Sequence, residues 1–430
     1  MSLSWFSIVR LGLIQMALGA IVVLTTSTLN RLMVVELALP AVLPGLLVAL
    51  HYGIQITRPN WGYRSDTGNS RTRWIVLGMA CLALGGLLAS YGVVLLGSSF
   101  GLGLLLSVLA YALIGLGVGA SGTSLLALLA TGTAPSRRAA AATITWLMMI
   151  AGIAITAGTV GAFLDPYTPE LLMRIVMIVV GSAFVMTCLA IWGIEKKTSF
   201  AVRETDDTPF MEGLKEVWSE PAARLFTIFV FLSMTAYFMQ ELILEPYAGF
   251  VFNFTPGQST SLSGAQNGGV FVGMLTVGIA ASGLKIGALR SWVVAGCLLS
   301  ALSLGAIAIL GQIGNAGLFT PAVVALGFSN GMFAVAAIGS MMQLAGEGRS
   351  KREGTRMGLW GAAQAIAAGF GGLMGALFVD VARAVLANDA TAFGSVFLFE
   401  AGLFVASALM ALRILGDGVS RQSPHLVPGE

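Results

Sequence analysis

The stretch Gly101–Leu129, GLGLLLSVLAYALIGLGVGASGTSLLALL, decides the class of fold because it holds no charged residue in 29 positions. A bilayer core of about 30 Å is crossed by an α-helix of about 20 predominantly apolar residues. The stretch therefore predicts a transmembrane helix. The whole chain agrees, because 57% of its residues are hydrophobic and only 10% are charged, too few charges to cover a water-facing surface.

Apolar runs of comparable length occur on both sides of this stretch. They predict an all-α membrane protein, because long runs without alternation satisfy their backbone groups only as helices. The first run continues past Arg10 to Thr28 without a small-residue cleavage site, and this predicts a membrane span in place of a cleaved signal peptide. The twelve predicted spans are Leu11–Thr28, Leu39–Ile56, Trp74–Leu96, Gly101–Leu129, Ala139–Phe163, Leu171–Trp192, Leu225–Phe250, Gly264–Leu284, Ser291–Leu310, Phe319–Leu344, Gly358–Val379 and Phe393–Leu412.

The basic residues predict the orientation of these spans. If both termini lie on one side, that side carries 20 of the 23 Lys and Arg residues, and the other side carries only Arg31, Arg174 and Arg383. Cytoplasmic loops are enriched in Lys and Arg. Both termini are therefore predicted to be cytoplasmic, in a multi-pass protein of a bacterial inner or intracytoplasmic membrane.

A polar stretch near the middle divides the chain into two halves. The predicted organisation is a six-helix half at 1–194, a cytoplasmic linker with an amphipathic helix at 195–224, a second six-helix half at 225–416 and a cytoplasmic tail at 417–430. Arg137 precedes Asp165 by 28 residues, and Arg352 precedes Asp380 by the same number. These matching positions, each bracketing the fifth span of its half, indicate parallel repeats.

Pairs of glycines four residues apart recur in the apolar runs. Such pairs allow helix backbones to approach closely within lipid. We expect them to serve packing, and they are Gly115 with Gly119, Gly269 with Gly273 and Gly371 with Gly375.

The loop after the second span reads Gly62-Tyr-Arg64-Ser-Asp66-Thr-Gly68 and resembles the signature loop of the major facilitator superfamily at Gly62 and Asp66. The resemblance implies the fold of that superfamily, with twelve transmembrane helices in two six-helix halves. Asp66 can meet the positive N-terminal end of a helix from the other half, so Gly62, Arg64 and Asp66 are a candidate inter-half latch. The alternative is that Asp66 is a solvated loop acid among arginines.

Ionisable residues within the spans are few. Such residues report function because charge inside a membrane is costly. Glu241 and Glu245 share a helix face before Pro246, and they either line a cavity or reach the membrane interface by snorkelling. His51 and Glu400 complete the set. No extended proton relay is apparent, which argues against an ordinary proton-coupled carrier.

Catalytic and metal-binding patterns are absent from the sequence. Its two histidines exclude a multi-histidine metal centre, its three cysteines lie singly in apolar runs, and no acidic pair has the spacing that holds magnesium diphosphate. The chain is therefore predicted not to be an enzyme. A net charge of +3 is too small to create the positive electrostatic potential that attracts nucleic acid.

A more specific resemblance involves Asn30, Arg31 and Glu36, followed by Pro40 and the loop Gly62–Thr67. This pattern resembles the bacteriochlorophyll delivery family, the PucC- and LhaA-like proteins, and it is closest to the branch labelled a bacteriochlorophyll synthase subunit. The resemblance implies a membrane factor that handles bacteriochlorophyll during assembly of light-harvesting complexes. From the residues alone, Arg31 and Glu36 close the first span and pair either with each other or with a partner polypeptide.

His51 is the candidate ligand for the magnesium of a bound pigment, because neutral imidazole is a competent ligand. A hydrogen-bonding role is the alternative. Glu241 and Glu245 are the other pigment-binding candidates, and no other metal site is expected. The expected partners are membrane lipid, antenna polypeptides and the bacteriochlorophyll synthase. A secondary transporter of a small solute and a non-catalytic subunit in bacteriochlorophyll synthesis remain alternative functions.

Overall fold

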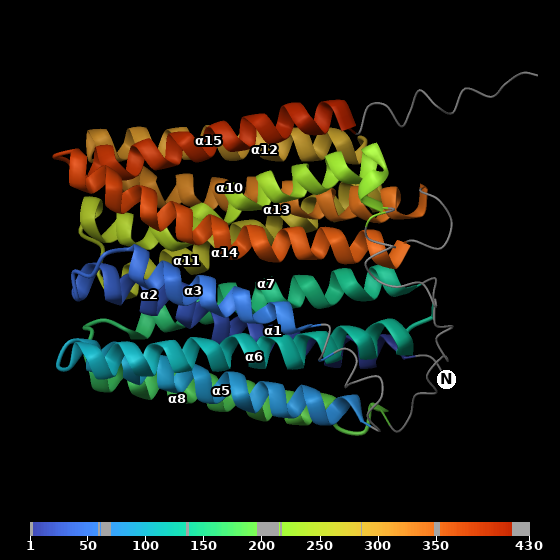
Figure 1. The fold of residues 1–430 in the computed structure, drawn as a ribbon, viewed down its shortest axis with the longest axis horizontal. Coiled ribbons are helices and arrows are strands. Elements are labelled where there is room, and N and C mark those ends of the chain that lie inside the picture. Colours follow the sequence, from blue (N-terminus) through green and yellow to red (C-terminus); the bar gives the residue numbers. More distant parts are fainter. Residues whose placement is uncertain are drawn as a thin grey trace, which may run out of the picture.

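The computed structural model describes residues 3–58, 61, 70–134, 137–195, 215, 217–284, 286–347 and 353–414. Helices dominate these residues and run side by side along one axis (Figure 1). In chain order the elements are α1 (Trp5–Val23) continued by η1 (Leu24–Thr28), α2 (Leu29–Arg31) and η2 (Leu32–Glu36), α3 (Val42–Ile54) continued by η3 (Gln55–Thr57), α5 (Arg71–Leu96), α6 (Phe100–Gly132), α7 (Arg138–Phe163), α8 (Pro169–Ile191), α10 (Pro221–Phe252), α11 (Pro256–Val277) continued by η6 (Gly278–Gly283), α12 (Leu289–Ile313), α13 (Ala316–Glu347), α14 (Glu353–Val385) and α15 (Asp389–Ile414).

The predicted all-α membrane fold is confirmed. Ten helical segments of the described residues are long and apolar enough to cross a membrane. The segment Val42–Thr57 is apolar but shorter, and α11 has the length of a span with a more polar sequence. Together with the ten, these two give the predicted twelve membrane helices, so the chain is a multi-pass membrane protein.

The helices form two groups that follow the order of the chain. In Figure 1 the blue-to-green helices α1–α8 occupy one part of the molecule, and the yellow-green-to-red helices α10–α15 occupy the other. One large cluster of buried apolar side chains lies in the first group, joined only by Leu242 from the second. Another belongs wholly to the second group. Each half therefore has an apolar core of its own.

The two ends of the bundle differ. At one end, here called the short-loop end, short connections join α5 to α6, α7 to α8, α10 to α11, α12 to α13 and α14 to α15. The start of α1 and the end of α15 both lie at the opposite end of the bundle (Figure 1). The distribution of Lys and Arg predicts that the short-loop end is periplasmic.

Glycines set the close helix contacts within each half. A Cβ on Gly115 would lie 2.6 Å from the His51 carbonyl oxygen, and one on Gly273 would lie 2.1 Å from that of Phe328. A Cβ on Gly375 would lie 2.6 Å from the carbonyl oxygen of Met239. No side chain fits at such distances, so the packing role predicted for the glycine pairs is confirmed except at Gly119, where a Cβ would make only ordinary contact with Trp61 at 3.4 Å.

The first membrane helix extends beyond the predicted span of Leu11–Thr28. The helical path continues from Trp5 to Glu36, and its last part contains two π-helical segments, η1 and η2. Asn30 and Arg31 were expected at the membrane face, yet they are only 1% and 2% exposed. The helix continues because their polar groups find partners in the other half, which the local sequence does not reveal.

A carboxylate also caps the start of α5. Glu195, just after α8, accepts hydrogen bonds from the Ser70 hydroxyl at 2.9 Å and from the backbone amides of Arg71 and Thr72 at 2.7 and 3.1 Å. Partial burial by itself would raise the pKa of Glu195, but these hydrogen bonds outweigh it and hold the pKa below its ordinary value. Glu195 thus joins the start of α5 to the end of α8 within the first half.

Several sequence-based predictions lie outside the described residues. These are the candidate latch Gly62, Arg64 and Asp66, most of the linker with its amphipathic helix, and the tail at 417–430. They stay predictions.

Reporter fusions test the orientation. Fusions after Thr198 and at the C-terminus should be active only as cytoplasmic reporters, because the Lys- and Arg-rich segments are retained on that side. Fusions near Thr168 and Thr255, at the short-loop end, should be active only as periplasmic reporters. Opposite activity of the first pair would contradict the predicted orientation.

Candidate functional site

Polar residues of the first membrane helix face the second half of the protein. The Asn30 amide donates to the Leu242 carbonyl oxygen at 2.7 Å, and the Ser27 hydroxyl donates to the Glu245 carboxylate. The hydroxyls of Thr28 and Thr260 lie 3.3 Å apart. Every one of these side chains is at most 5% exposed. We call this surface, formed by Ser27–Arg31 against α10 and the start of α11, the polar seam.

The π-helical segment η1 lies within this seam. Its hydrogen bonds run from residue i to residue i+5, a geometry that occurs mostly as single turns and often at functional sites. The wider turn carries Thr25, Thr26, Ser27 and Thr28 in succession, all of them buried. The seam therefore combines an unusual backbone with a concentration of hydroxyl groups.

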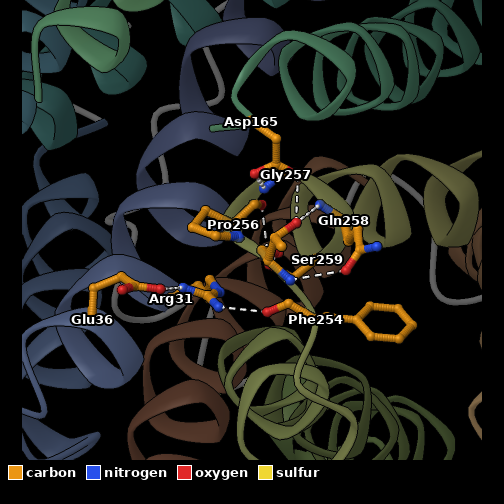
Figure 2. Close-up of polar contacts among 9 residues, drawn as sticks. Arg31, Glu36, Asp165, Phe254, Pro256, Gly257, Gln258 and Ser259 are labelled. Carbon is orange, nitrogen blue, oxygen red and sulfur yellow. Dashed lines mark hydrogen bonds and ion pairs between the residues drawn. The ribbon is translucent and has the colours of Figure 1, made fainter. Parts of the chain in front are cut away.

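Arg31 connects the seam to the turn between α10 and α11 (Figure 2). Its Nη1 pairs with the Glu36 carboxylate, and its Nη2 donates to the Phe254 carbonyl oxygen at 2.7 Å. α10 ends at Asn253, which adopts a left-handed conformation with φ of 56° and exposes the following carbonyl groups. The sequence left open whether Arg31 and Glu36 pair with each other or with a partner polypeptide. In the structure they pair with each other.

Asp165, at the end of α7, caps the start of α11 (Figure 2). Its carboxylate accepts hydrogen bonds from the Thr255 hydroxyl and from the Gly257 amide, the latter at 3.0 Å. Thr255 and Gln258 also form a capping box on the same helix. The first amides of a helix lack intrahelical partners and carry partial positive charge, so a carboxylate stabilises them. This cap explains why α11 begins at Pro256 although the predicted span began at Gly264.

Asp380, near the end of α14, makes the equivalent contact in the opposite direction. Its two carboxylate oxygens accept from the backbone amides of Ala41 and Val42, at 2.9 and 2.7 Å, where α3 begins. Asp165 therefore joins the first half to the second, and Asp380 joins the second half to the first. The two aspartates occupy the matching repeat positions seen in the sequence, and we call them the twin caps.

The structure separates the two glutamates of α10. Glu245 is only 3% exposed and faces the seam, so it does not snorkel to the membrane interface. One oxygen accepts from Ser27, and the other has no hydrogen-bond partner among the described residues. Glu241 is less buried.

His51 is buried in α3 and hydrogen-bonded. Its Nε2 lies 2.8 Å from the Gln55 side-chain nitrogen, and Gln55 in turn accepts from Arg58. The ring is 2% exposed and packs edge-on against Tyr52 with the centroids 4.7 Å apart. No group of three or more His, Cys, Asp and Glu residues is arranged for metal binding in the described part of the chain.

A shallow pocket opens beside the second of the twin caps. It lies between Ala38–Pro40 of the first half and the stretch from Asp380 to Asp389 of the second. Arg383 occupies one wall, where its Nε donates to Asp389 at 2.7 Å and its guanidinium lies 4.1 Å from the centre of the Phe250 ring. The charged groups in this wall are thus already paired within the protein.

Comparison with known protein families shows which family shares these features. The model of the family described as PUCC protein matches residues 28–419, which include both caps and all of the seam except Ser27. The chain belongs to the PucC protein family. It is 66% identical to the "Bacteriochlorophyll synthase 44.5 kDa chain" of Rhodobacter capsulatus, over all of both chains. It is 28% identical to "Protein PucC" of Cereibacter sphaeroides, over 96% of this chain and 93% of that one.

Solved structures of transporters share the fold of this PucC family member. A structure from work on proton-dependent oligopeptide transporters matches with a TM-score of 0.72 and 13% identity, over 97% of this chain and 100% of that one. The nucleoside transporter NupG matches with a TM-score of 0.66 and 12% identity, over 95% and 99%. The fold is thus that of the major facilitator superfamily, as the sequence predicted.

The sequence singled out Asn30, Arg31 and Glu36, and in the structure Asn30 and Arg31 contact the second half while Arg31 pairs with Glu36. It missed the capping role of Asp165 and Asp380. In the sequence both aspartates served only to mark the repeat. Their equal distance from Arg137 and Arg352 was the available signal. That spacing indicated a repeat but not the helix start that each aspartate meets in the other half.

Neutralising the twin caps should loosen the short-loop end. In a cysteine-free background with Ser259→Cys as the reporter, the double variant Asp165→Asn/Asp380→Asn should react faster with a thiol reagent. Each lost charge at a helix N-terminus costs ~0.3–1 kcal/mol, so the two together predict a rate increase of about 3- to 30-fold. Ser259 is a suitable reporter because it is fully buried in the first turns of α11.

Asp389→Asn is the matched control. It removes the same charge at the same end but breaks a contact with Arg383 that stays within the second half. An unchanged labelling rate in the double variant, or an equal increase in the control, would show that the caps do not hold the halves together.

Proposed function

We propose that this protein holds bacteriochlorophyll, or a pigment-loaded antenna polypeptide, in the membrane during assembly of light-harvesting complexes. In this role it binds and delivers an apolar ligand and does not pump a solute. It acts without catalysis, in a bacterial inner or intracytoplasmic membrane with both termini in the cytoplasm. Its partners are antenna polypeptides and, given the name of its relative, the bacteriochlorophyll synthase.

Membership of the PucC family is the observation that carries the proposal. The match extends over residues 28–419, nearly the whole membrane part of the chain. A relative of equal length, 66% identical, bears the name of a bacteriochlorophyll synthase chain. These likenesses support a pigment-related function more specifically than the fold does, because one fold serves many unrelated functions.

The geometry of the seam supports an apolar ligand over a polar solute. Asn30, Arg31, Ser27 and Thr28 each direct a hydrogen bond across the seam to the other half. Groups that already bind protein leave little polar surface for a sugar, peptide or nucleoside, whose own polar groups need partners when they are desolvated. Large apolar side chains on outward helix faces, such as Leu302 at 69% and Leu409 at 58% exposed, offer contact to a macrocycle or to a helix of an antenna polypeptide.

In this conformation the Nε2 atom of His51 is engaged by Gln55 and the ring is buried. Ligation through Nε2 would require its contact with Gln55 to break and the buried ring to become accessible. The hydrogen-bonding role is therefore favoured by the geometry. We assign pigment binding to the apolar surface of the protein, with no step passing through this histidine.

Deletion of the gene tests the function. Assembled antenna complexes should fall several-fold, whereas the free pigment precursor should change little, because assembly and not synthesis would be interrupted. Absorption spectra of isolated membranes measure both. Complementation with the wild-type gene is the control.

Three other outcomes identify the competing functions. Loss of pigment together with its precursor pool, accompanied by copurification with the prenyl-transferring enzyme, would indicate a non-catalytic synthase subunit. Prenyl transfer by the purified protein alone would make it an enzyme. Normal antenna levels together with uptake of a soluble substrate by proteoliposomes would indicate a secondary transporter.

His51→Leu separates the two roles of the histidine. We expect the purified variant to melt at a lower temperature, because Gln55 loses a buried partner, and to keep the near-infrared band of any copurified pigment unchanged. Absorption spectroscopy and thermal unfolding on the same sample provide the measurement, with Gln55→Leu as a companion that breaks the same hydrogen bond. A band that shifts in the His51 variant alone would establish magnesium ligation.

A further inference from the structure

The second half contains a buried polar group of residues that lies apart from the seam. Its members are Gln240 on α10, Ser300 on α12, Asn330 on α13 and Glu400 on α15, and each is at most 2% exposed. Ser300 donates to the Asn330 side-chain oxygen at 2.8 Å. Polar side chains this deep in a membrane protein are costly unless they have partners.

Contacts between α13 and α15 bring Asn330 and Glu400 to the same depth. The rings of Phe333 and Phe404 touch, with their centroids 6.0 Å apart. Both helices run away from the short-loop end, Asn330 precedes Phe333 by three residues, and Glu400 precedes Phe404 by four. Each polar residue thus lies about one helical turn from the aromatic contact, on the same face and in the same direction.

Tyr247 fixes the depth of the other two residues. Its ring lies 5.0 Å from that of Phe397 on α15, and its hydroxyl donates to the Ile307 carbonyl oxygen on α12 at 3.0 Å. Gln240 precedes Tyr247 by seven residues, and Ser300 precedes Ile307 by seven. Gln240 and Ser300 therefore each lie about 10 Å farther from the short-loop end than the contact residue on the same helix. Glu400 follows Phe397 on a helix of opposite direction. All four polar residues therefore converge on one layer of the second core.

The hydrogen bonds in this layer are incomplete. Four buried atoms have no partner among the described residues, namely both carboxylate oxygens of Glu400, Oε1 of Gln240 and Nδ2 of Asn330. If Glu400 is ionised, three of them are acceptors and only one is a donor. An ionised carboxylate without a donor is strongly disfavoured in such surroundings.

No hydrogen bond or ion pair among the described residues compensates a negative Glu400. The arginines of α15 and of the helices packed against it lie toward the helix ends, and they are Arg224 of α10, Arg290 of α12, Arg356 and Arg383 of α14 and Arg413 of α15. Arg383 is paired with Asp389. The titratable neighbours in this core are Tyr247, which is bonded to Ile307, and the neutral thiol of Cys297 on α12. Glu241 and Glu245 on α10 are acids themselves and would add like charge.

We propose that Glu400 forms a buried proton-binding site in the second half, beside Gln240, with the proton carried by the Glu400 carboxyl group. One proton removes the uncompensated charge of the carboxylate and gives this layer a donor that it lacks. The Glu400 hydroxyl then donates to Oε1 of Gln240, while Ser300 and Asn330 form a separate hydrogen bond between α12 and α13.

Infrared spectroscopy of the full-length protein in lipid nanodiscs at neutral pH tests the site. The wild type should show the C=O stretching band of a protonated carboxylic acid, with an isotope shift after exchange into D2O. Glu400→Gln should lose this band or most of its intensity. Glu170→Gln, at an exposed position in the first turn of α8, is the control and should leave the band intact.

Thermal unfolding of two variants distinguishes the proton site from mere packing. Glu400→Gln should keep the melting temperature, because an amide offers the same one-donor, one-acceptor pattern as the protonated acid. Glu400→Leu should lower it by roughly 3–6 °C, because Gln240 then loses its partner.

Three results would overturn the proposal. The first is a wild type without the carboxylic acid band, or a band that persists unchanged in Glu400→Gln. The second is a Glu400→Gln variant as unstable as Glu400→Leu. The third is stabilisation of the wild type by sodium chloride over choline chloride that Glu400→Gln abolishes, because the occupant would then be a metal cation.

Discussion

The architecture depends on carboxylates that cap helix starts across the boundary between the two halves. The first amides of a helix have no partner of their own, and the other half supplies one at the start of α3 and another at the start of α11. These are also the second helices of their halves, and they are the two that length or apolarity alone would not mark as membrane spans. The opposite half therefore stabilises α3 and α11, the two helices that membrane burial alone favours least.

Because of this arrangement, the two-fold repeat also determines how the two halves are held together. α7 packs against α11 and α14 against α3, so each half lends an acid to the other at the same end of the bundle. A change that separates the halves at the short-loop end breaks both caps together. Backbones meet at glycines within each half and also across the boundary, where a Cβ on Gly264 of α11 would lie 2.5 Å from the Gly158 amide nitrogen of α7.

Polar groups are thus divided between two places with different chemistry. At the seam, Arg31, Asn30 and Glu245 connect the first membrane helix to α10 and to the turn that follows it. In the second core, Glu400 lies among Gln240, Asn330 and Ser300, away from the boundary. The first half has no counterpart of Glu400 on α8, where the described residues from Leu171 to Ile191 include Arg174 as their only charged side chain, and it is exposed. The repeats agree in their caps and differ in their interiors.

The sequence alone determined the membrane class, the twelve helices and the division into halves. The length and apolarity of a segment are local properties, and they decide whether that segment can cross a bilayer as a helix. It also grouped Asn30, Arg31 and Glu36 through a family resemblance that the match over residues 28–419 confirms. Only the tertiary structure gave Asp165 and Asp380 their caps, carried the first helix on to Glu36 and started α11 at Pro256. The partners in these contacts lie far apart in the chain, as Asp380 and Ala41 do at a separation of 339 residues. A hydrogen bond between such residues exists only once the two halves have packed, so no local pattern encodes it.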